Sequence, residues 1–307
     1  MSAGEPAASA STLVEVDRPE DLPPLRDVIA AIGLTARKSL GQNFLLDLNL
    51  TQRIARAGRS LTERAVVEVG PGPGGLTRAL LMQGARRVIA VERDARCEPA
   101  LRQIASAWPG RLDVVFDDAT KIDWASLVRD VERPISIAAN LPYGVATKLL
   151  TDWLETEPWP PWFDSMVLMF QREVADRILA APGTKPYGRL SVIAQYRCAV
   201  RRALNLPPSA FVPAPKVESS VVVFEPLAAP MPTCRIATLS RMTAAAFGQR
   251  RKMLRVSLKQ LTPFPELLLN RTGIAPERRA EELSVADFAR LAAAYDCARD
   301  DRAVLPD

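Results

Sequence analysis

The chain of 307 residues is long enough for one large domain or two smaller ones with a substantial core. It contains no histidine, which excludes a Ser-His-Asp triad, a histidine-ligated metal and a histidine general base, so any chemistry must use carboxylates, amides, backbone groups or a reactive cofactor. The net charge of +5 describes a basic protein and favours a polyanionic partner.

The cysteines and the apolar residues of the chain indicate in which cellular compartment the protein is found. The four cysteines are scattered and form no C-x-x-C pair, which argues against zinc and against a disulfide framework and is typical of a reducing cytoplasm. No run of about 18 apolar residues could span a membrane. The first residues lack the basic and apolar regions of a secretory signal. We therefore expect a cytoplasmic protein that binds no metal.

The chain begins with an acidic segment, residues 1–24, that is rich in alanine, serine and proline. This segment carries five acidic residues and one arginine, so the rest of the chain is more basic than the net charge indicates. Its composition predicts a disordered leader. After it, Arg26–Ile32 has the pattern of a short helix that Gly33 closes.

The next segment, Thr35–Asp47, reads T-A-R-K-S-L-G-Q-N-F-L-L-D. Its amide pair Gln42-Asn43 stands beside Phe44, a combination that a plain linker does not need. We interpret the segment as a lid over a bound nucleoside. Asp47 is a good N-cap for a helix over Leu48–Ala57.

The stretch Ala65–Gly75, A-V-V-E-V-G-P-G-P-G-G, has the strand, glycine turn and helix start of a nucleotide-binding motif. Its valines favour a buried strand. The glycines allow close approach of a ligand and leave amide donors free at the helix start. Glu92 closes a second apolar run about twenty residues on, where a ribose-binding carboxylate is expected. The pattern predicts a bound nucleoside, and it fits a dinucleotide as well as other nucleoside cofactors.

From Ala65 onward, apolar strand patterns alternate with helical patterns. The predicted strands are Val66–Val69, Val88–Val91, Leu112–Phe116, Ile135–Ala139 and Met166–Phe170, and the predicted helices are Leu76–Gln83, Ala95–Ala107, Trp124–Val131, Val145–Leu154 and Arg172–Leu179. Such alternation predicts an α/β fold with a parallel sheet covered on both faces. Ligands of these sheets bind at the carboxyl ends of the strands, which here carry Gly70, Glu92, Asp117-Asp118 and Asn140.

The tetrapeptide Asn140-Leu141-Pro142-Tyr143 follows the predicted strand Ile135–Ala139. The carboxamide oxygen of Asn140 and the carbonyl of Leu141 can both accept hydrogen bonds from an exocyclic amine. Pro142 stiffens the loop, and the ring of Tyr143 offers a face on which a flipped base can stack. Together with the glycine turn, this loop predicts methylation of a base amino group with S-adenosylmethionine as the methyl donor.

These motifs resemble the KsgA (RsmA) family of small-subunit rRNA adenine N6,N6-dimethyltransferases, over nearly everything from Lys38 to about Leu291. The matching segments are L-G-Q-N-F-L at Leu40–Leu45, V-E-V-G-P-G at Val67–Gly72, N-L-P-Y at Asn140–Tyr143, F-Q-R-E-V at Phe170–Val174, Y-G-R-L-S-V at Tyr187–Val192, P-P-S-A-F-V-P-A-P-K-V at Pro207–Val217 and F-G-Q-R-R-K at Phe247–Lys252. The chain departs from many relatives at Gly144-Val145-Ala146, where they have Asn-Ile-Ser.

The resemblance implies a Rossmann-like class I methyltransferase domain over residues 25–226. It implies that S-adenosylmethionine is held by residues of the strand ends and the lid, namely Asn43, Leu45, Gly70, Gly72, Glu92, Asp118 and Asn140. Within that set, Glu92 would hold the ribose and Asp118 the adenine amine of the cofactor. Asn140, Leu141 and Tyr143 would lie against the target adenine. The implied substrate is a pair of adjacent adenines near the 3′ end of 16S rRNA, within an immature small ribosomal subunit. The resemblance also implies that the enzyme acts as a monomer.

Residues 227–307 follow a proline-rich linker and have helical patterns, which predicts a small all-helical domain. Its basic residues include Arg250, Arg251, Lys252 and Arg255, for which we expect RNA phosphate contacts. Arg251, Arg255 and Lys259 recur every four residues, which predicts one basic helical face.

Three other functions compete with this interpretation. A related family that methylates 23S rRNA and confers macrolide resistance shares the fold, but typically has isoleucine where Leu141 stands. A non-catalytic RNA-binding assembly factor would not need the set Glu92, Asp118 and Asn140. A nicotinamide dehydrogenase would fit the glycine turn alone.

Overall fold

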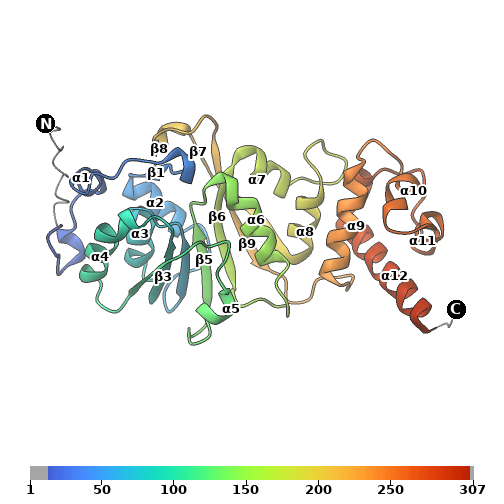
Figure 1. Cartoon of the computed structure of the whole chain (residues 1–307), viewed down its shortest axis with the longest axis horizontal. Coiled ribbons are helices and arrows are strands. Elements are labelled where there is room, and N and C mark those ends of the chain that lie inside the picture. Colours follow the sequence, from blue (N-terminus) through green and yellow to red (C-terminus); the bar gives the residue numbers. More distant parts are fainter. Residues whose placement is uncertain (1–12, 305–307) are drawn as a thin grey trace, which may run out of the picture. The chain divides into compact units, whose positions relative to one another are not determined.

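The computed structural model describes residues 13–304 (Figure 1). Residues 1–12 of the predicted leader lie outside the described residues. Residues 13–24 include a 3-10 turn, η1 (Pro19–Asp21), and two of their main-chain groups bond to side chains of helix α4 (Glu98–Ala107). The carbonyl of Val14 accepts from Gln103, and the amide of Val16 donates to Ser106. The structure thus has contacts where the sequence predicts disorder, because these backbone groups find polar partners on α4.

A seven-stranded sheet with the strand order β4-β3-β2-β5-β6-β9-β7 contains all of the predicted strands. The strands are β2 (Ala65–Val69), β3 (Arg87–Glu92), β4 (Leu112–Phe116), β5 (Ile135–Ala139), β6 (Ser165–Gln171), β7 (Cys198–Leu206) and β9 (Ser219–Pro226). The first five of these in spatial order, β4 through β6, pair in parallel. Every residue of β2 and β5 is buried, which is why their sequences are apolar runs rather than alternating patterns.

The helices that precede or follow these strands confirm the predicted alternation (Figure 1). They are α1 (Leu25–Ala31), α2 (Leu48–Ala55), α3 (Gly75–Met82), α4, α5 (Trp124–Leu127), α6 (Tyr143–Leu154), α7 (Arg172–Ile178) and α8 (Arg189–Arg197). Asp47 caps α2 as predicted, since its side chain accepts from the amides of Asn49 and Leu50. Helix α5 is shorter than predicted, because the main chain after Leu127 continues in turns with i to i+3 bonds.

A small two-stranded sheet joins two segments that are far apart in the sequence. Strand β1 (Phe44–Leu45) pairs antiparallel with β8 (Phe211–Val212), and Leu45 lies opposite Phe211. Neither strand is predicted from the sequence, because two residues are too few to show a strand period. The pairing connects the segment L-G-Q-N-F-L with the segment P-P-S-A-F-V-P-A-P-K-V.

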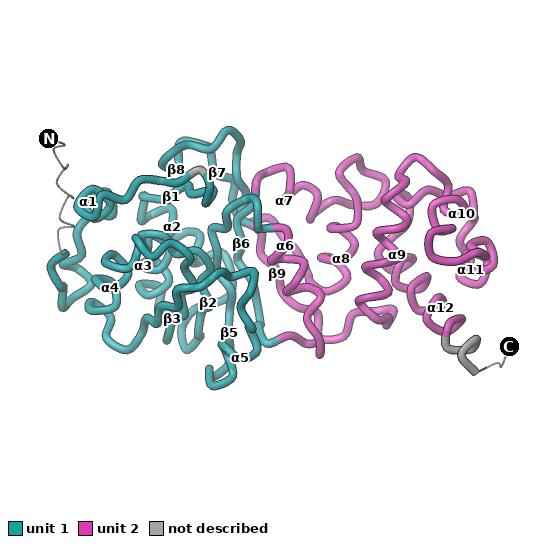
Figure 2. The backbone as a smooth tube through the Cα atoms, viewed as in Figure 1, with its two compact units in different colours: residues 1–146, 162–170, 203–221 teal, residues 147–161, 171–202, 222–307 magenta. Residues whose placement is uncertain are grey.

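The chain divides into two compact units (Figure 2). The first comprises Met1–Ala146, Trp162–Phe170 and Ala203–Val221, and the second comprises Thr147–Pro161, Gln171–Arg202 and Val222–Asp307. Within the second unit, the part after residue 222 includes α9 (Ile236–Gly248), α10 (Leu254–Ser257), α11 (Pro265–Arg271) and α12 (Val285–Val304). The domain limits expected from the sequence, 25–226 and 227–307, remain a prediction.

The predicted basic helical face of Arg251, Arg255 and Lys259 is wrong. Helix α9 ends at Gly248, and Gln249 leaves the helical region with a ψ of 57°. Arg251 therefore lies in a turn, Arg255 on α10, and Lys259 on the 3-10 turn η5 (Leu258–Gln260). The spacing of four residues could not reveal this, because it assumes one uninterrupted helix.

Candidate active site

The carboxyl ends of four neighbouring strands bring the predicted site residues together in the first unit. β4, β3, β2 and β5 are parallel, and their pairing extends to their last residues. Glu92 ends β3, Gly70 and Asn140 directly follow β2 and β5, and Asp118 comes two residues after β4. These four residues therefore lie along one edge of the sheet, the edge at which ligands of parallel α/β proteins bind.

The glycine turn between β2 and α3 has a backbone that favours glycine at Gly70 (φ +70°), Gly72 (φ +55°) and Gly74 (φ +91°). A Cβ atom at Gly74 would lie 2.1 Å from Cδ1 of Ile104, so no side chain fits there without displacing the Ile104 side chain of α4. A Cβ at Gly70 would meet no heavy atom of the described residues within 4 Å. The turn thus packs tightly against α4 on one side and leaves open space beside Gly70 on the other.

Glu92 is buried at the end of β3, where its carboxylate is held by two backbone amides. Oε2 accepts from the amide of Gly72 at 2.8 Å, and Oε1 accepts from the amide of Asp94 at 2.7 Å. Burial raises the pKa of Glu92, although these hydrogen bonds act in the opposite direction. Each carboxylate oxygen has a second lone pair, so Glu92 is oriented by the protein and can still accept hydrogen bonds from a ligand.

A second carboxyl group, that of Glu68, lies inside β2 just before the glycine turn. Glu68 is 1% exposed, and its Oε2 has no hydrogen-bond partner among the described residues. Burial raises the pKa of Glu68 to about 8; the Thr77 hydroxyl acts in the opposite direction, and the charge of Glu92 adds a smaller increase. Glu68 is therefore predominantly protonated at neutral pH in the ligand-free protein.

The segment Thr35–Leu45, which we call the lid segment, lies against the glycine turn. The ring of Phe44 is so close to Gly72 that a Cβ there would be 3.3 Å from its Cε1. A Cβ on Gly75 would lie 2.6 Å from the carbonyl oxygen of Leu45. A Cβ on Gly41 would likewise lie 3.2 Å from Cβ of Pro142, so Gly41 packs against this proline. The lid segment therefore contacts both the glycine turn and the loop that begins at Asn140.

The loop after β5 carries the residues expected to receive the target base. The side-chain nitrogen Nδ2 of Asn140 donates to the main-chain carbonyl of Asn43 at 3.1 Å. This bond orients the side-chain amide and leaves its oxygen as an acceptor. The side chain of Leu141 is buried. Tyr143 is half-buried at the start of α6, and its hydroxyl is hydrogen-bonded to the hydroxyl of Ser219 at 2.7 Å. The ring of Tyr143 is therefore held in place by a polar contact that the sequence does not predict.

Asp118 lies just after β4 and is hydrogen-bonded to a residue of the same loop. Its Oδ1 accepts from the amide and the hydroxyl of Thr120 at 3.0 and 2.7 Å, and Oδ2 lies 3.6 Å from Nη1 of Arg93. These contacts, led by the hydroxyl of Thr120, lower the pKa of Asp118, so it is ionised at neutral pH. It provides a fixed negative acceptor at the edge of the site.

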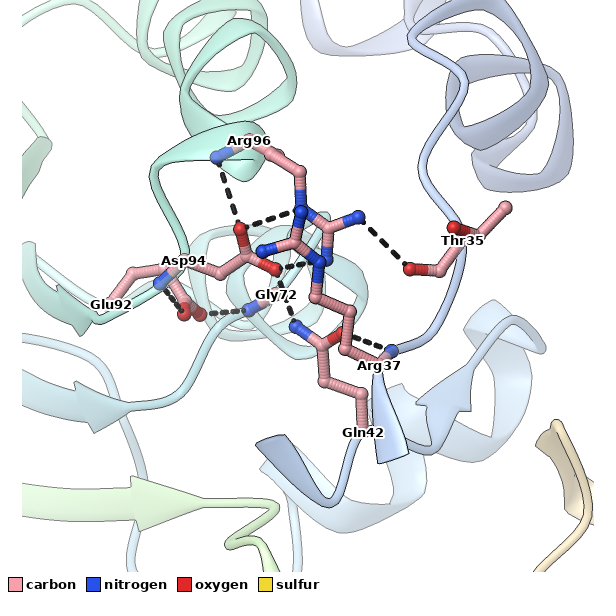
Figure 3. Close-up of polar contacts among 7 residues, drawn as sticks. All are labelled: Thr35, Arg37, Gln42, Gly72, Glu92, Asp94 and Arg96. Atoms are coloured by element: carbon pink, nitrogen blue, oxygen red, sulfur yellow. Dashed lines mark hydrogen bonds and ion pairs between the residues drawn. The ribbon is translucent and has the colours of Figure 1, made fainter. Parts of the chain in front are cut away.

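Sequence reasoning missed two side chains beside the site, Asp94 and Arg96, and did not pair them with Gln42 of the predicted lid. The three side chains form a hydrogen-bonded group between the lid segment and the turn after Glu92 (Figure 3). The sequence contained one weak signal, since Asp94 stands where an N-cap of the following helix belongs. It does cap the 3-10 turn η3 (Ala95–Cys97), but nothing in the sequence pairs it with Gln42.

The basic residues expected to contact RNA lie in the second unit after α9. Arg251, Lys252 and Arg255 are exposed, and Nη1 of Arg255 is 3.9 Å from Glu266. Arg250 is partly covered and donates to Oε2 of Glu281 at 2.8 Å. The exposed charges of Arg251 and Lys252 are available for a polyanion, whereas Arg250 and Arg255 each have a carboxylate nearby.

A parallel sheet with a glycine turn after one strand, an acid at the end of the next, and an Asn-Leu-Pro-Tyr loop defines a class I methyltransferase. Solved structures support this class. A dimethyladenosine transferase from Plasmodium falciparum superimposes with a TM-score of 0.68 and 25% identity, covering 80% of this chain and 94% of its own. The 23S rRNA methyltransferase ErmE superimposes with a TM-score of 0.62 and 25% identity, covering 83% of this chain and 100% of its own.

The chain belongs to the ribosomal RNA adenine dimethylase family, whose model matches residues 33–296. The ribosomal RNA small subunit methyltransferase A of Xanthobacter autotrophicus is 60% identical over 273 residues, which cover 89% of this chain and 94% of the relative. The protein of the same name from Azorhizobium caulinodans is 59% identical over 280 residues, 91% of this chain and 95% of the relative. The resemblance inferred from the motifs is confirmed, and the chain is an enzyme of this family.

Among residues 13–304, no helix is long and apolar enough to cross a membrane. Within the same range, no group of three or more histidine, cysteine or acidic side chains could hold a metal ion.

Proposed function

We propose that this enzyme transfers methyl groups from S-adenosylmethionine to the N6 atoms of two adjacent adenines near the 3′ end of 16S rRNA. The observation that carries the proposal is the row of Gly70, Glu92, Asp118 and Asn140 at one sheet edge, with the lid segment lying against the glycine turn. Relatives of this chain at 59–60% identity are named small-subunit rather than large-subunit methyltransferases, which supports 16S rRNA as the substrate.

The residues present fit S-adenosylmethionine on three structural grounds. A Cβ at Gly70 would meet no heavy atom of the described residues within 4 Å, so the backbone there is open to the methionine part. Glu92 is oriented by two amides and has lone pairs for ribose hydroxyls. The unpaired Oε2 of Glu68 is a buried polar atom that a bound ammonium group would satisfy. Asp118 would accept from the adenine amine, and Asn43 and Leu45 would cover the cofactor from the lid segment. When bound, the cofactor supplies a methyl group already activated on a sulfonium.

The chain's own contribution to transfer is to orient the adenine amine. Its lone pair is delocalised into the ring, so the amine is a poor nucleophile. Hydrogen bonds from its two protons to Oδ1 of Asn140 and the carbonyl of Leu141 would favour a more tetrahedral nitrogen and thereby localise the lone pair. The bond from Asn140 to Asn43 supports this role, since it commits the amide nitrogen and leaves the oxygen to accept. Loss of the surplus proton to water can follow transfer, and no histidine is needed.

Tyr143 would provide the face on which the flipped adenine stacks, a contact typically worth about 1–3 kcal/mol per base. The bond to Ser219 supports this role, because it holds the ring in one orientation before a base arrives. Such preorganisation reduces the entropy lost on binding.

RNA capture would depend on the exposed basic residues Arg251, Lys252 and Arg255, assisted by Arg250. We also propose that the enzyme acts as a monomer in the cytoplasm, on a small ribosomal subunit that is still being assembled. Membership of the ribosomal RNA adenine dimethylase family supports this proposal.

A transfer assay with labelled S-adenosylmethionine tests the function. The substrates are small subunits that lack the adenine methyl groups, naked 16S rRNA, and 23S rRNA. We expect label in N6,N6-dimethyladenine of the small subunit and little label in the other two RNAs. Label in 23S rRNA would instead identify the large-subunit activity, and binding of small subunits without any transfer would identify a non-catalytic assembly factor.

A further inference from the structure

Asp94 is a buried carboxylate that belongs neither to the row of cofactor residues nor to the base-side loop. Its side chain is 4% exposed and is surrounded by donors (Figure 3). Arg96 donates through Nε to Oδ1 at 2.9 Å and through Nη2 to Oδ2 at 2.6 Å. Gln42 donates through Nε2 to Oδ2 at 2.8 Å. Asp94 thus joins a residue of the lid segment to the turn after β3.

Both partners of Asp94 extend the connection into the main chain of the lid segment. Oε1 of Gln42 accepts from the amide of Arg37 at 2.9 Å. Nη1 of Arg96 donates to the carbonyl of Thr35 at 3.2 Å. One carboxylate therefore holds the lid segment through three of its residues, Thr35, Arg37 and Gln42.

The same turn also carries Glu92. The amide of Asp94 donates to Oε1 of Glu92, whose Oε2 accepts from Gly72. The backbone of Asp94 thus orients the acid at the edge of the site, while its side chain holds the segment that lies against the glycine turn. A displacement of the lid segment would be transmitted to this turn through short, direct hydrogen bonds.

We propose that Asp94, with Gln42 and Arg96, is a positioning group that keeps the lid segment closed over the cofactor site. The inference rests on the proposed function, because it assigns the cofactor to the space beside the glycine turn. Asp94 acts through Gln42 and Arg96 and does not itself contact the cofactor. The lid segment is also connected to the rest of the first unit by the hydrogen bond from Asn140 to Asn43 and by the pairing of β1 with β8.

The charge of Asp94 suits this role. The side-chain hydrogen bonds from Arg96, followed by those from Gln42 and the amide of Arg96, lower the pKa of Asp94 to about 2 despite burial. The carboxylate is therefore ionised throughout the neutral range. Hydrogen bonds to an ionised acceptor are shorter and stronger than neutral ones, so the three groups form a well-defined closed state rather than a loose contact.

The test compares Gln42→Ala with Gln52→Ala, a matched control that removes a glutamine of α2 outside this group. Hydrogen exchange of residues 35–43 in the ligand-free chain reports whether the lid segment is held. Calorimetry measures the affinity for S-adenosylmethionine, and single-turnover methylation at saturating cofactor measures the rate. For Gln42→Ala we expect exchange and the cofactor dissociation constant to rise about tenfold each, the scale of one hydrogen bond to a charged group. The saturated rate should change less than about twofold.

Asp94→Asn provides the second variant, because it keeps the shape of the side chain but removes its charge. It should produce changes at least as large as those of Gln42→Ala, because it also weakens the connection through Arg96, and adding Gln42→Ala to it should change little further. Unchanged exchange in both variants would overturn the proposal, and so would faster exchange with wild-type cofactor affinity. If the wild-type chain binds no S-adenosylmethionine, the proposed function fails, whereas exchange in the ligand-free chain still decides whether Asp94 holds the lid segment.

Discussion

The side-chain amide of Asn140 donates a hydrogen bond of 3.1 Å to the main-chain carbonyl of Asn43, which joins the base-side loop to the lid segment. One amide group thus has two separate tasks. Its nitrogen donates to the lid segment, and in the proposed function its oxygen accepts from the substrate amine. A residue with a carboxamide can do both, whereas a carboxylate can only accept.

Asn140→Asp should therefore slow methyl transfer while leaving the fold intact. The carboxylate cannot donate to Asn43, and its charge opposes the carbonyl dipole. We expect the single-turnover rate to fall by roughly 10- to 100-fold, the scale of one lost polar contact of about 1.5–3 kcal/mol. Asn49→Asp, an exposed position on α2, is the control and should keep the wild-type rate. An Asn140→Asp enzyme with undiminished transfer would contradict the assigned role.

Tyr143 should contribute to stability through its hydroxyl and to activity through its ring. The hydroxyl is hydrogen-bonded to Ser219, which is fully buried. Tyr143→Phe should lower the free energy of unfolding by about 1 kcal/mol because Ser219 loses its partner, but retain most activity. Tyr143→Ala should in addition forfeit about 1–3 kcal/mol of stacking in transfer or capture of the adenine.

Ser219→Ala separates these two effects of Tyr143. Alone it should cost about as much stability as Tyr143→Phe, and added to Tyr143→Phe it should cost little more, since both partners are then gone. Thermal melts and single-turnover methylation provide the two measurements. A folded Tyr143→Phe protein that binds cofactor but transfers no methyl group would refute the stacking role.

Glu92→Ala should weaken S-adenosylmethionine binding by about 1–3 kcal/mol, the scale of a lost charged hydrogen bond, with RNA affinity near normal. The same change should lower the melting temperature, because the amides of Gly72 and Asp94 lose their acceptor. Calorimetry and a thermal melt measure the two effects. Glu98→Ala, at the exposed start of α4, is the control. Unchanged cofactor affinity would exclude Glu92 from the ribose site.

Glu68 should make the ligand-free protein less stable as pH rises. Burial raises its pKa from 4.5 to about 8, so the folded state holds a proton that the unfolded state releases above about 4.5. This contribution to stability is complete below pH 4.5 and is lost progressively as pH rises through about 8. Urea denaturation of Glu68→Gln should show a smaller loss of stability between pH 6 and 9 than wild type. Equal losses in the two proteins would place the titration elsewhere.

Replacing Arg251 and Lys252 together by alanine should weaken RNA binding and make its salt dependence shallower, with cofactor affinity unchanged. Both side chains are exposed, so removing them costs no ion pair of the kind that Arg250 makes with Glu281. Binding isotherms at several salt concentrations give the slope. Arg290→Ala, on α12, is the control for loss of one charge. An unchanged slope would mean that these residues face solvent in the RNA complex.

Local patterns were sufficient for the five parallel strands β2 to β6 and for the residues at their carboxyl ends, but β7 and β9, which complete the sheet, were not predicted. The apolar runs of β2 and β5 and the glycine turn each depend on residues that are adjacent in the chain. Parallel strands align their carboxyl ends at one edge, so Gly70, Glu92 and Asn140 could be grouped before the structure was known. The break in helical structure between Arg251 and Arg255 could not be predicted in this way, because the spacing of four residues continues formally across it.

The sequence by itself determined the alternation of strands and helices, the glycine turn and the identity of the loop at Asn140. Only the tertiary structure decided that Gln42 meets Asp94, that Tyr143 meets Ser219 and that β1 pairs with β8. The physical reason is the range of the interactions. Secondary structure follows from the periodicity of neighbouring residues, whereas a hydrogen bond between side chains 52 or 76 positions apart leaves no periodic trace and exists only once the sheet has brought its ends together.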